Sequence, residues 1–191
     1  MALLGLPFRS VAADVDETPG EGEAPADTAM RLALSKAQAV AARFPQALVI
    51  GCDTIVALDG RVLGKPRDAA EARAMLTALR GRVHSVYSGV AIVGDGQMVV
   101  TGVETVVTMR DYAKEEMEEY IASGDPFDKA GAYAVQHPTF RPVAHWDGCY
   151  ANVMGFPLCC VAQILGPMNV TAHPPADSGL CIPDRNCLPR R

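Results

Sequence analysis

The stretch of sequence that decides the fold is Ala47–Leu63, which reads ALVIGCDTIVALDGRVL. Its first five residues form a short apolar run of the kind found in buried strands. Farther on, Thr54–Leu58 and Arg61–Leu63 flank the dipeptide Asp59-Gly60. This dipeptide favours a hairpin because both of its residues tolerate the positive φ that a tight two-residue turn requires. The stretch therefore predicts a buried strand followed by a hairpin.

The chain before this stretch predicts an exposed loop and then a helix. Residues 12–26 carry five acidic residues together with prolines and glycines, a composition typical of a loop in solvent. From Asp27 the pattern becomes helical, and Asp27 itself is placed to cap the first turn. The apolar residues that recur at three- and four-residue spacing are Met30, Ala33, Leu34, Ala37 and Val40.

The chain after the stretch continues to alternate between helix and strand. Asp68 and Glu71 form a capping-box-like start to a helix that ends near Leu79. Two β-rich runs, 83–93 and 97–108, are joined around Gly94–Gly96. Such alternation with hairpins indicates a mixed α/β domain.

The last part of the chain predicts two more helices and a tail. We expect Asp111 to cap a helix that stops at Gly124, residues 130–154 to form short strands and turns, and Pro157 to open a helix over 158–165. Residues 167–191 contain five prolines and no periodicity. We therefore expect one domain over residues 1–166 and a loosely ordered extension over 167–191.

Composition excludes several classes of protein. The chain has 191 residues, 49% hydrophobic and 20% charged, so it can bury a core without disulfides or metals. Its net charge of −5 argues against a broad electrostatic binder of nucleic-acid polymers. No apolar run approaches the roughly 20 residues that a membrane-spanning helix needs. The N-terminus has neither a basic region nor a cleavage site, so the expected location is the cytoplasm.

The cysteines give no clear metal or disulfide pattern. None of the six forms a CxxC pair, and none combines with histidine at zinc-ligand spacing. Cys52, Cys159 and Cys160 lie in apolar stretches and are expected to be small core residues. Cys181 and Cys187 either pair, bind a metal or remain reduced thiols.

Asp53 is the first candidate for chemistry. It follows the apolar run that ends at Gly51, and open α/β sheets place ligands just beyond the ends of buried strands. Such a carboxylate could deprotonate water or hold a divalent cation. The alternative is an ordinary turn or capping aspartate.

Further candidates are basic, acidic and amide side chains in loops. Lys65 and Lys129 lie close to glycines, and Lys36 lies on the expected helix. Next to a glycine the backbone can approach a phosphate closely, and the ammonium group neutralises its charge. Glu17, in the run Asp14-Val15-Asp16-Glu17, supplies hard oxygen ligands for Mg²⁺ or Mn²⁺. Gln136 carries an amide that could read a base edge. Taken singly, such residues are more often ordinary solvated side chains, and the case for a site rests on their combination with Asp53.

Several motifs now point to one family. These motifs are GCDTIV (51–56), GKPRD (64–68), SGDPFDKAGAYAVQ (123–136), LGLPF (4–8), DVDE (14–17), LSKA (34–37) and GCYANVMGFPL (148–158). In order and spacing they resemble the Maf family of septum-formation-inhibitor proteins, which are regarded as nucleoside triphosphate pyrophosphatases. The resemblance covers about residues 3–165.

The resemblance implies a fold and a reaction. The fold is an α/β twisted mixed sheet flanked by helices, with a cleft between two lobes, often in a homodimer. The reaction is hydrolysis of a nucleoside triphosphate to the monophosphate and pyrophosphate, assisted by a divalent cation, Mg²⁺ or Mn²⁺. Attack at the α-phosphorus makes pyrophosphate the leaving group, whose charge a metal and lysines would neutralise.

The resemblance also assigns residue roles. Asp53 matches the family's proton acceptor. Glu17 matches an acidic residue near the metal and the phosphates, and Glu17 and Asp53 are the expected metal ligands. Thr54 and Gln136 match positions linked to substrate choice. Thr54 resembles the subgroup that acts on dTTP and UTP, so the expected substrate is dTTP, UTP or a modified pyrimidine nucleotide. A substrate of the 7-methyl-GTP type is the alternative within the family. The pocket's basic residues are matched by Lys36, Lys65 and Lys129.

One departure leaves a rival hypothesis open. Family members begin with a strand and a Ser-x-Ser-Pro-Arg-Arg loop before LGLPF, whereas the sequence here begins close to LGLPF. Arginines in such a loop would make bidentate phosphate contacts. The expectation is either a misassigned start codon or a catalytically weakened relative that binds nucleotide or a cell-division partner. No P-loop, dinucleotide fingerprint or hydrolase elbow is present, so those enzyme classes are excluded.

Overall fold

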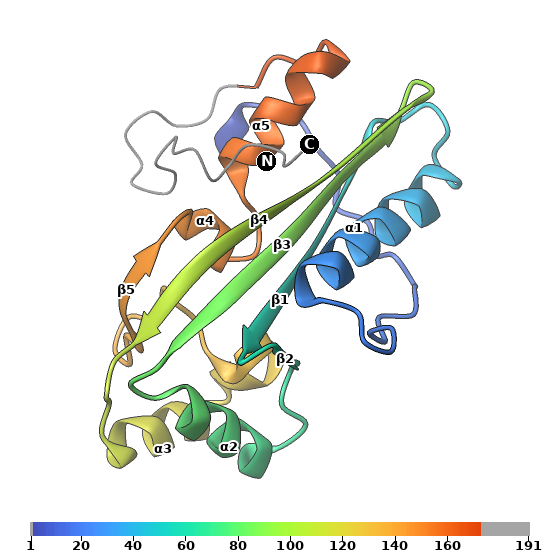
Figure 1. Cartoon of the computed structure of the whole chain (residues 1–191). Helices are drawn as coiled ribbons and strands as arrows, with labels where there is room; N and C mark the ends of the chain where they lie inside the picture. The colour runs from blue at the N-terminus through green and yellow to red at the C-terminus, as the bar shows by residue number, and fades with distance from the viewer. Residues whose placement is uncertain (1, 173–191) are drawn as a thin grey trace.

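A computed structural model describes residues 2–172 and shows one five-stranded sheet with helices on both faces (Figure 1). The strand order is β2-β1-β3-β4-β5. The strands are β1 (Val49–Leu58), β2 (Arg61–Leu63), β3 (Val83–Gly94), β4 (Gln97–Met109) and β5 (Val143–Asp147). The α-helices are α1 (Pro25–Ala41), α2 (Ala69–Leu79), α3 (Lys114–Ala122), α4 (Tyr150–Val153) and α5 (Leu158–Leu165). Four 3₁₀ turns join them: Ala2–Leu4, Asp125–Asp128, Ala130–Ala132 and Gly166–Met168.

The α/β class and the flanking helices are confirmed, but the strand directions differ from the expected mixed sheet. Every pairing among the described strands is antiparallel. The reason lies in the position of β1, which pairs with β2 on one side and with β3 on the other. Strands β2 and β3 run in the same direction on either side of β1, so the connection through α2 creates no parallel neighbours.

Helix α1 lies unusually close to the sheet because glycines face it. A Cβ atom on Gly51 would lie 2.2 Å from the carbonyl oxygen of Ala33, and one on Gly89 would lie 2.2 Å from that of Ala29. The backbone of the helix therefore packs directly on β1 and β3 at the two glycines, where no side chain keeps it away. This close approach fixes the height and rotation of α1 over the strands.

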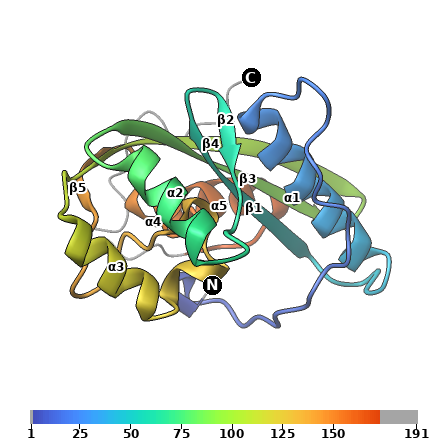
Figure 2. The ribbon, with the colours of Figure 1, turned by 90° about the horizontal axis from the view of Figure 1, so that it is seen from below.

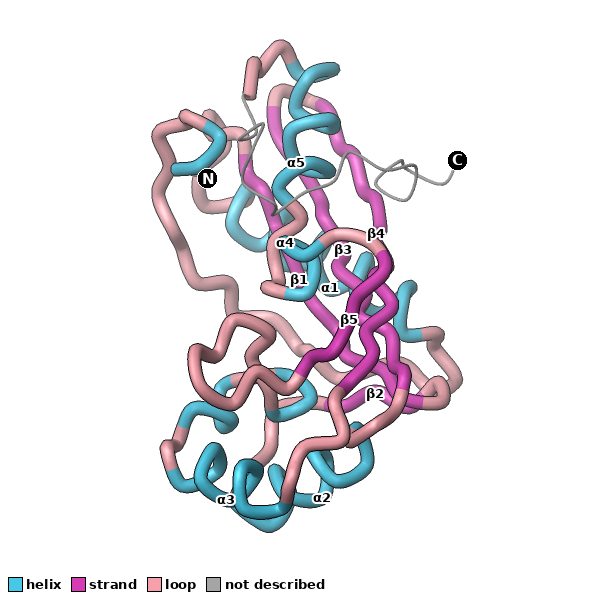
Figure 3. Tube along the Cα trace, turned by 90° about the vertical axis from the view of Figure 1, so that its left-hand side faces the viewer, coloured by secondary structure: helices cyan, strands magenta, loops and turns pink. Residues whose placement is uncertain are grey.

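The other side chains of the sheet face two separate apolar clusters. One cluster joins α2 and α3 to the ends of the strands through Leu76, Tyr112 and Tyr133. The second joins α5 and the N-terminal turn to the opposite part of the sheet through Leu4 and Val161. Figure 3 shows α2 and α3 gathered at one end of the sheet and α5 at the other, and Figure 2 views the molecule from the end that carries α2 and α3. The molecule thus has two lobes built on one continuous sheet.

The structure corrects three local predictions. Helix α1 begins at Pro25 with Ala24 as its N-cap, so Asp27 lies within the first turn instead of capping it. Helix α3 begins at Lys114, where Glu116 accepts a hydrogen bond from the backbone N–H of Ala113, so Asp111 is not the cap. The segment 130–154 contains the short helix α4 besides its strand and turns. Confirmed are the Asp68 cap, which accepts from Glu71 N at 2.8 Å, and the end of α3 before Gly124.

Two further findings concern the ends of the chain and membranes. The expected extension is described only as far as residue 172, and the predictions for Cys181 and Cys187 lie outside the described residues. Cys159 and Cys160 are buried in α5, as predicted. Among residues 2–172, no helix combines the length and apolarity that crossing a membrane demands.

Candidate active site

Three of the candidate residues form one contact cluster. The ammonium of Lys36 donates to Glu17 Oε1 and to Asp53 Oδ1, in each case over 2.6 Å. The Asp53 side chain is 11% exposed, whereas that of Glu17 is 58% exposed. The cluster therefore runs from the buried surface of the sheet to solvent, with Lys36 between two carboxylates.

The packing of α1 on the sheet creates this cluster. Asp53 lies two residues beyond Gly51 on the same face of β1, and it pairs in register with Gly89 of β3. Lys36 adjoins Ala37, whose backbone nitrogen would lie 2.8 Å from a Cβ on Gly51. Asp53 stands inside β1 and not beyond the end of a strand, which corrects the placement expected from the sequence.

The surroundings of Asp53 suit a base. Burial raises the pKa of the Asp53 carboxyl above its ordinary value, and the hydrogen bond and charge of Lys36 offset that increase only in part. For Lys36, burial lowers the pKa, but the hydrogen bonds to Asp53 and Glu17 outweigh it and the pKa is raised. Lys36 therefore stays charged at neutral pH, while Asp53 has a higher proton affinity than an ordinary aspartate.

Lys65 extends the positive charge toward this cluster from the loop after β2. Its side chain is exposed, and its charge opposes the dominant effect of burial on the pKa of Asp53. The loop is fixed to a second segment, Lys129 to Gln136, because the backbone N–H of Gly131 donates to the carbonyl of Gly64 at 3.0 Å. A Cβ on Gly131 would lie 2.9 Å from Val56 Cγ1, so this second segment lies directly against β1.

Lys129 belongs to that second segment and is held by acidic neighbours. Its ammonium donates to the carbonyl of Asp125 at 2.8 Å and to Asp128 Oδ1 at 2.7 Å. The charge of Lys65 also contributes to lowering the pKa of Asp128, whose main cause is the hydrogen bond from Lys129. Lys65 and Lys129 are thus neighbouring groups at one border of the site, and neither contacts the carboxylates of Glu17 and Asp53 directly.

The two residues expected to select the substrate are not brought into this cluster. Thr54 lies on the opposite face of β1 from Asp53, where its hydroxyl is 2.7 Å from Ser88 Oγ and donates to the carbonyl of Gly155 at 3.3 Å. Gln136 is exposed, three residues after the buried Tyr133. A ligand that met Asp53 and both of these residues would have to pass around the edge of β1.

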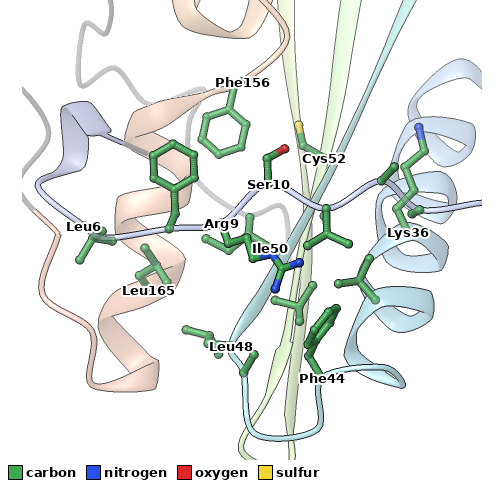
Figure 4. Close-up of a pocket in the computed structure, with 18 of the residues that line it drawn as sticks. Leu6, Arg9, Ser10, Lys36, Phe44, Leu48, Ile50, Cys52, Phe156 and Leu165 are labelled. Atoms are coloured by element: carbon green, nitrogen blue, oxygen red, sulfur yellow. The ribbon is translucent and has the colours of Figure 1, made fainter.

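A hollow of about 960 Å³ adjoins the cluster (Figure 4). The segment Leu6–Ser10 crosses it, with Lys36 on the α1 side and with Phe156 and Leu165 on the other. Glu17 and Lys36 line one end, and most of the remaining lining is apolar. Asp53, Lys65 and Lys129 are not among the lining residues of the described chain. The hollow therefore borders the polar site without being the polar site itself.

The carboxylates of Glu17 and Asp53 are candidate ligands for a divalent cation. Glu17 and Asp53 meet at one ammonium, and Mg²⁺ commonly uses one or two carboxylates together with substrate phosphates. Within residues 2–172, no group of three or more His, Cys, Asp or Glu side chains gathers as a ready-made metal site. The residues present fit a cation that shares its ligands with a substrate.

Comparison with known proteins gives the family. The family described as Maf-like protein matches residues 1–168. This chain belongs to the Maf family. Relatives named dTTP/UTP pyrophosphatase include those of Symbiobacterium thermophilum, 45% identical over 85% of this chain and 84% of the relative, and Pelotomaculum thermopropionicum, 47% identical over 85% and 86%. The protein of that name from Myxococcus xanthus is 50% identical over 83% and 80%.

Several residues beside the candidate site were not expected from the sequence. Glu23 accepts hydrogen bonds from Arg31 Nε and Nη2 at 2.7 and 2.8 Å, while Arg31 Nη2 also donates to the carbonyl of Thr18. This clamp fastens the acidic loop beside Glu17 to α1. Arg9, next to the LGLPF block, lines the hollow with its guanidinium 5.6 Å from the ring centre of Phe44. The eight-residue spacing of Glu23 and Arg31 gives no local pattern that would have revealed their contact.

Proposed function

We propose that this Maf protein hydrolyses dTTP and UTP to the corresponding monophosphates and pyrophosphate. The observation that carries the proposal is the contact of Glu17, Lys36 and Asp53, in which a mostly buried carboxylate lies 2.6 Å from an ammonium. The names of the relatives supply the reaction and the nucleotides. Lys36, Lys65 and Lys129 would then bind phosphate oxygens.

Asp53 would act as the general base. Its raised pKa, caused chiefly by burial, lets it take a proton from a water molecule as that water attacks the α-phosphorus. The bond between the α-phosphorus and its bridging oxygen breaks, and pyrophosphate leaves. Lys36 would hold the carboxylate in place and neutralise the charge that develops on the phosphate oxygens.

Glu17 and Asp53 would hold a divalent cation, Mg²⁺ or Mn²⁺, together with the substrate phosphates. When bound, such a cation neutralises phosphate charge and stabilises the leaving group. The exposed position of Glu17 leaves its second oxygen accessible from solvent. Lys36 already bonds both carboxylates, so it would keep them oriented as substrate arrives.

Thr54 and Gln136 would contribute to substrate choice from the other side of β1. The Thr54 hydroxyl is fixed by Ser88 and Gly155, which makes it a rigid polar group. Gln136 is exposed and carries both a donor and an acceptor. A cytoplasmic location, where nucleoside triphosphates are present, completes the proposal.

The experiment is pyrophosphate release from dTTP and UTP with Mg²⁺ or Mn²⁺, measured for the protein and for Asp53→Asn. We expect loss of at least about a hundredfold in kcat, because an amide cannot take the proton. Asp111→Asn is the matched control, because Asp111 is an exposed aspartate that pairs with Arg80 and not with Lys36. Full activity in Asp53→Asn would refute the role of Asp53. Nucleotide binding without hydrolysis in the unmodified protein would favour the hypothesis of a catalytically weakened binding protein. Cleavage of 7-methyl-GTP instead of dTTP would refute the proposed substrates.

A further inference from the structure

A buried hydrogen bond ties the segment that carries Lys129 and Gln136 to the sheet. Tyr133 lies within this segment, and its hydroxyl is 2.8 Å from Nε2 of His84, near the start of β3. The two rings meet edge to face, with centres 5.4 Å apart. A single side chain of the segment is thereby bonded to a strand almost fifty residues earlier in the chain.

Both partners are buried, so the bond matters more than a surface contact would. His84 is 4% exposed and Tyr133 is 5% exposed. Burial lowers the pKa of His84 to about 4, so the imidazole is neutral at physiological pH. Its Nδ1 is buried without a hydrogen-bond partner, which leaves the contact with Tyr133 as the bond that compensates for burying the ring.

Regular structure in the segment from Lys129 to Gln136 is limited to the 3₁₀ turn Ala130–Ala132, which is kinked at Gly131, so side-chain contacts help to hold its backbone. Gly131 and Ala132 are both left-handed, with φ of 69° and 60°, and Ala132 is fully buried. A left-handed alanine persists where its surroundings determine it. The chain becomes extended at Tyr133, and Gln136 follows three residues later.

We propose that His84 and Tyr133 are a positioning pair that sets the placement of Lys129 and Gln136 relative to Asp53. The inference rests on the proposed function, in which Lys129 binds phosphate and Gln136 contacts the base. His84 touches neither the substrate nor Asp53 directly. It acts through the hydroxyl of Tyr133 and, through that, on the segment from Lys129 to Gln136.

Tyr133→Phe is the primary test because it removes only the hydroxyl and keeps the ring. We expect kcat/KM for dTTP to fall about ten- to a hundredfold, mainly through a higher KM, since small displacements of positioned groups have effects of this size. The preference for dTTP over dCTP should narrow as well. His84→Gln, which retains a hydrogen-bonding group, should recover part of the loss that His84→Leu causes.

Tyr112→Phe is the matched control. Tyr112 is a buried tyrosine of the same apolar cluster, and its hydroxyl donates to the carbonyl of Leu76 at 2.6 Å. Its loss removes a comparable buried hydrogen bond whose acceptor lies on α2 and which involves no residue from Lys129 to Gln136. We expect a lower unfolding midpoint with little change in KM or in nucleotide preference.

The double variant His84→Leu/Tyr133→Phe separates positioning from stability. Removing both polar partners leaves no unpaired group between them, so stability should recover relative to the single variants. A positioning role predicts that the high KM persists. Recovery of KM together with stability would overturn the proposal.

Binding distinguishes failure of this inference from failure of the proposed function. Absence of hydrolysis in the unmodified protein would refute the proposed activity alone. The same substitutions are then placed in Asp53→Asn protein, and dTTP binding is measured by titration calorimetry. Weaker binding in Tyr133→Phe, with unchanged binding in Tyr112→Phe, supports the positioning pair; equal binding in both overturns it.

Discussion

At the scale of single residues, two opposing effects set the protonation of Asp53. Burial raises the pKa of its carboxyl, while Lys36 and, more weakly, Lys65 lower it. A base works only when deprotonated, so activity is present above this pKa and is lost as the pH falls through it. The acid limb of the pH profile therefore reports on the neighbours of Asp53.

Lys36→Gln should move that acid limb to higher pH. The substitution removes the ammonium that favours the charged carboxylate, so the pKa of Asp53 rises further. The measurement is kcat/KM for dTTP between about pH 4 and pH 8, because this ratio follows groups of the free enzyme. Lys65→Gln is the graded control and should give a smaller shift in the same direction. A shift to lower pH in Lys36→Gln would contradict the assignment.

At the scale of elements, the seating of α1 controls both stability and the site. Gly51→Ala would place a Cβ 2.2 Å from the Ala33 carbonyl oxygen, which forces the helix away from β1. We expect a loss of about 1 to 3 kcal/mol in the free energy of unfolding, as for other overpacked sites. Activity should also fall, because Lys36 moves with the helix. Urea unfolding and pyrophosphate release measure the two effects.

Gly64→Ala is the matched control for that substitution. A Cβ on Gly64 has no neighbour within 4 Å, and its φ is not positive. Its stability should therefore remain close to that of the unmodified protein. A loss in Gly64→Ala equal to that in Gly51→Ala would show that glycine flexibility, and not helix seating, explains the effect.

The clamp between Glu23 and Arg31 gives an element-level pH dependence. The hydrogen bond from Arg31 is the main reason that the pKa of Glu23 falls from 4.5 to about 2. Because the folded pKa is depressed, the stabilisation is present above about pH 4.5 and is lost as the pH falls toward 2. Glu23→Gln should flatten the change of the urea midpoint in this range, and Glu21→Gln, an exposed neighbour, should not. An unchanged pH dependence in Glu23→Gln would argue against the clamp.

At the scale of the whole molecule, local patterns predicted elements better than their arrangement. The hairpin at Asp59-Gly60 and the Asp68 cap follow from turn and capping preferences, and both are observed. Gly51, in contrast, suggested the end of a strand. Its actual role is to let α1 approach the middle of β1, and that depends on a helix elsewhere in the chain.

The residues of the site were predicted more completely than their arrangement in space. The resemblance identified Glu17, Lys36 and Asp53, and the structure places all three in contact. The strand directions come from long-range pairing, which local preferences do not specify. The separation of Asp53 from Thr54 by the plane of the sheet follows once both residues lie inside β1, because successive side chains of a strand point to opposite faces. The His84–Tyr133 bond likewise joins segments whose proximity is visible only after folding.

The distribution of lysines over the molecule leads to a final prediction. The chain has four lysines, and only Lys114, at the start of α3, has no role in the proposed site. In Asp53→Asn protein, which is not expected to turn over substrate, dTTP should raise the melting temperature, since a ligand at about 100 times its Kd stabilises a protein by about 2.7 kcal/mol. Lys65→Ala and Lys129→Ala should each reduce this increase at a fixed dTTP concentration, because each removes a phosphate contact from the same border of the site. Lys114→Ala should retain the full increase in melting temperature. An equal reduction in all three variants would mean that stabilisation by dTTP depends on the net charge of the protein and not on a defined site.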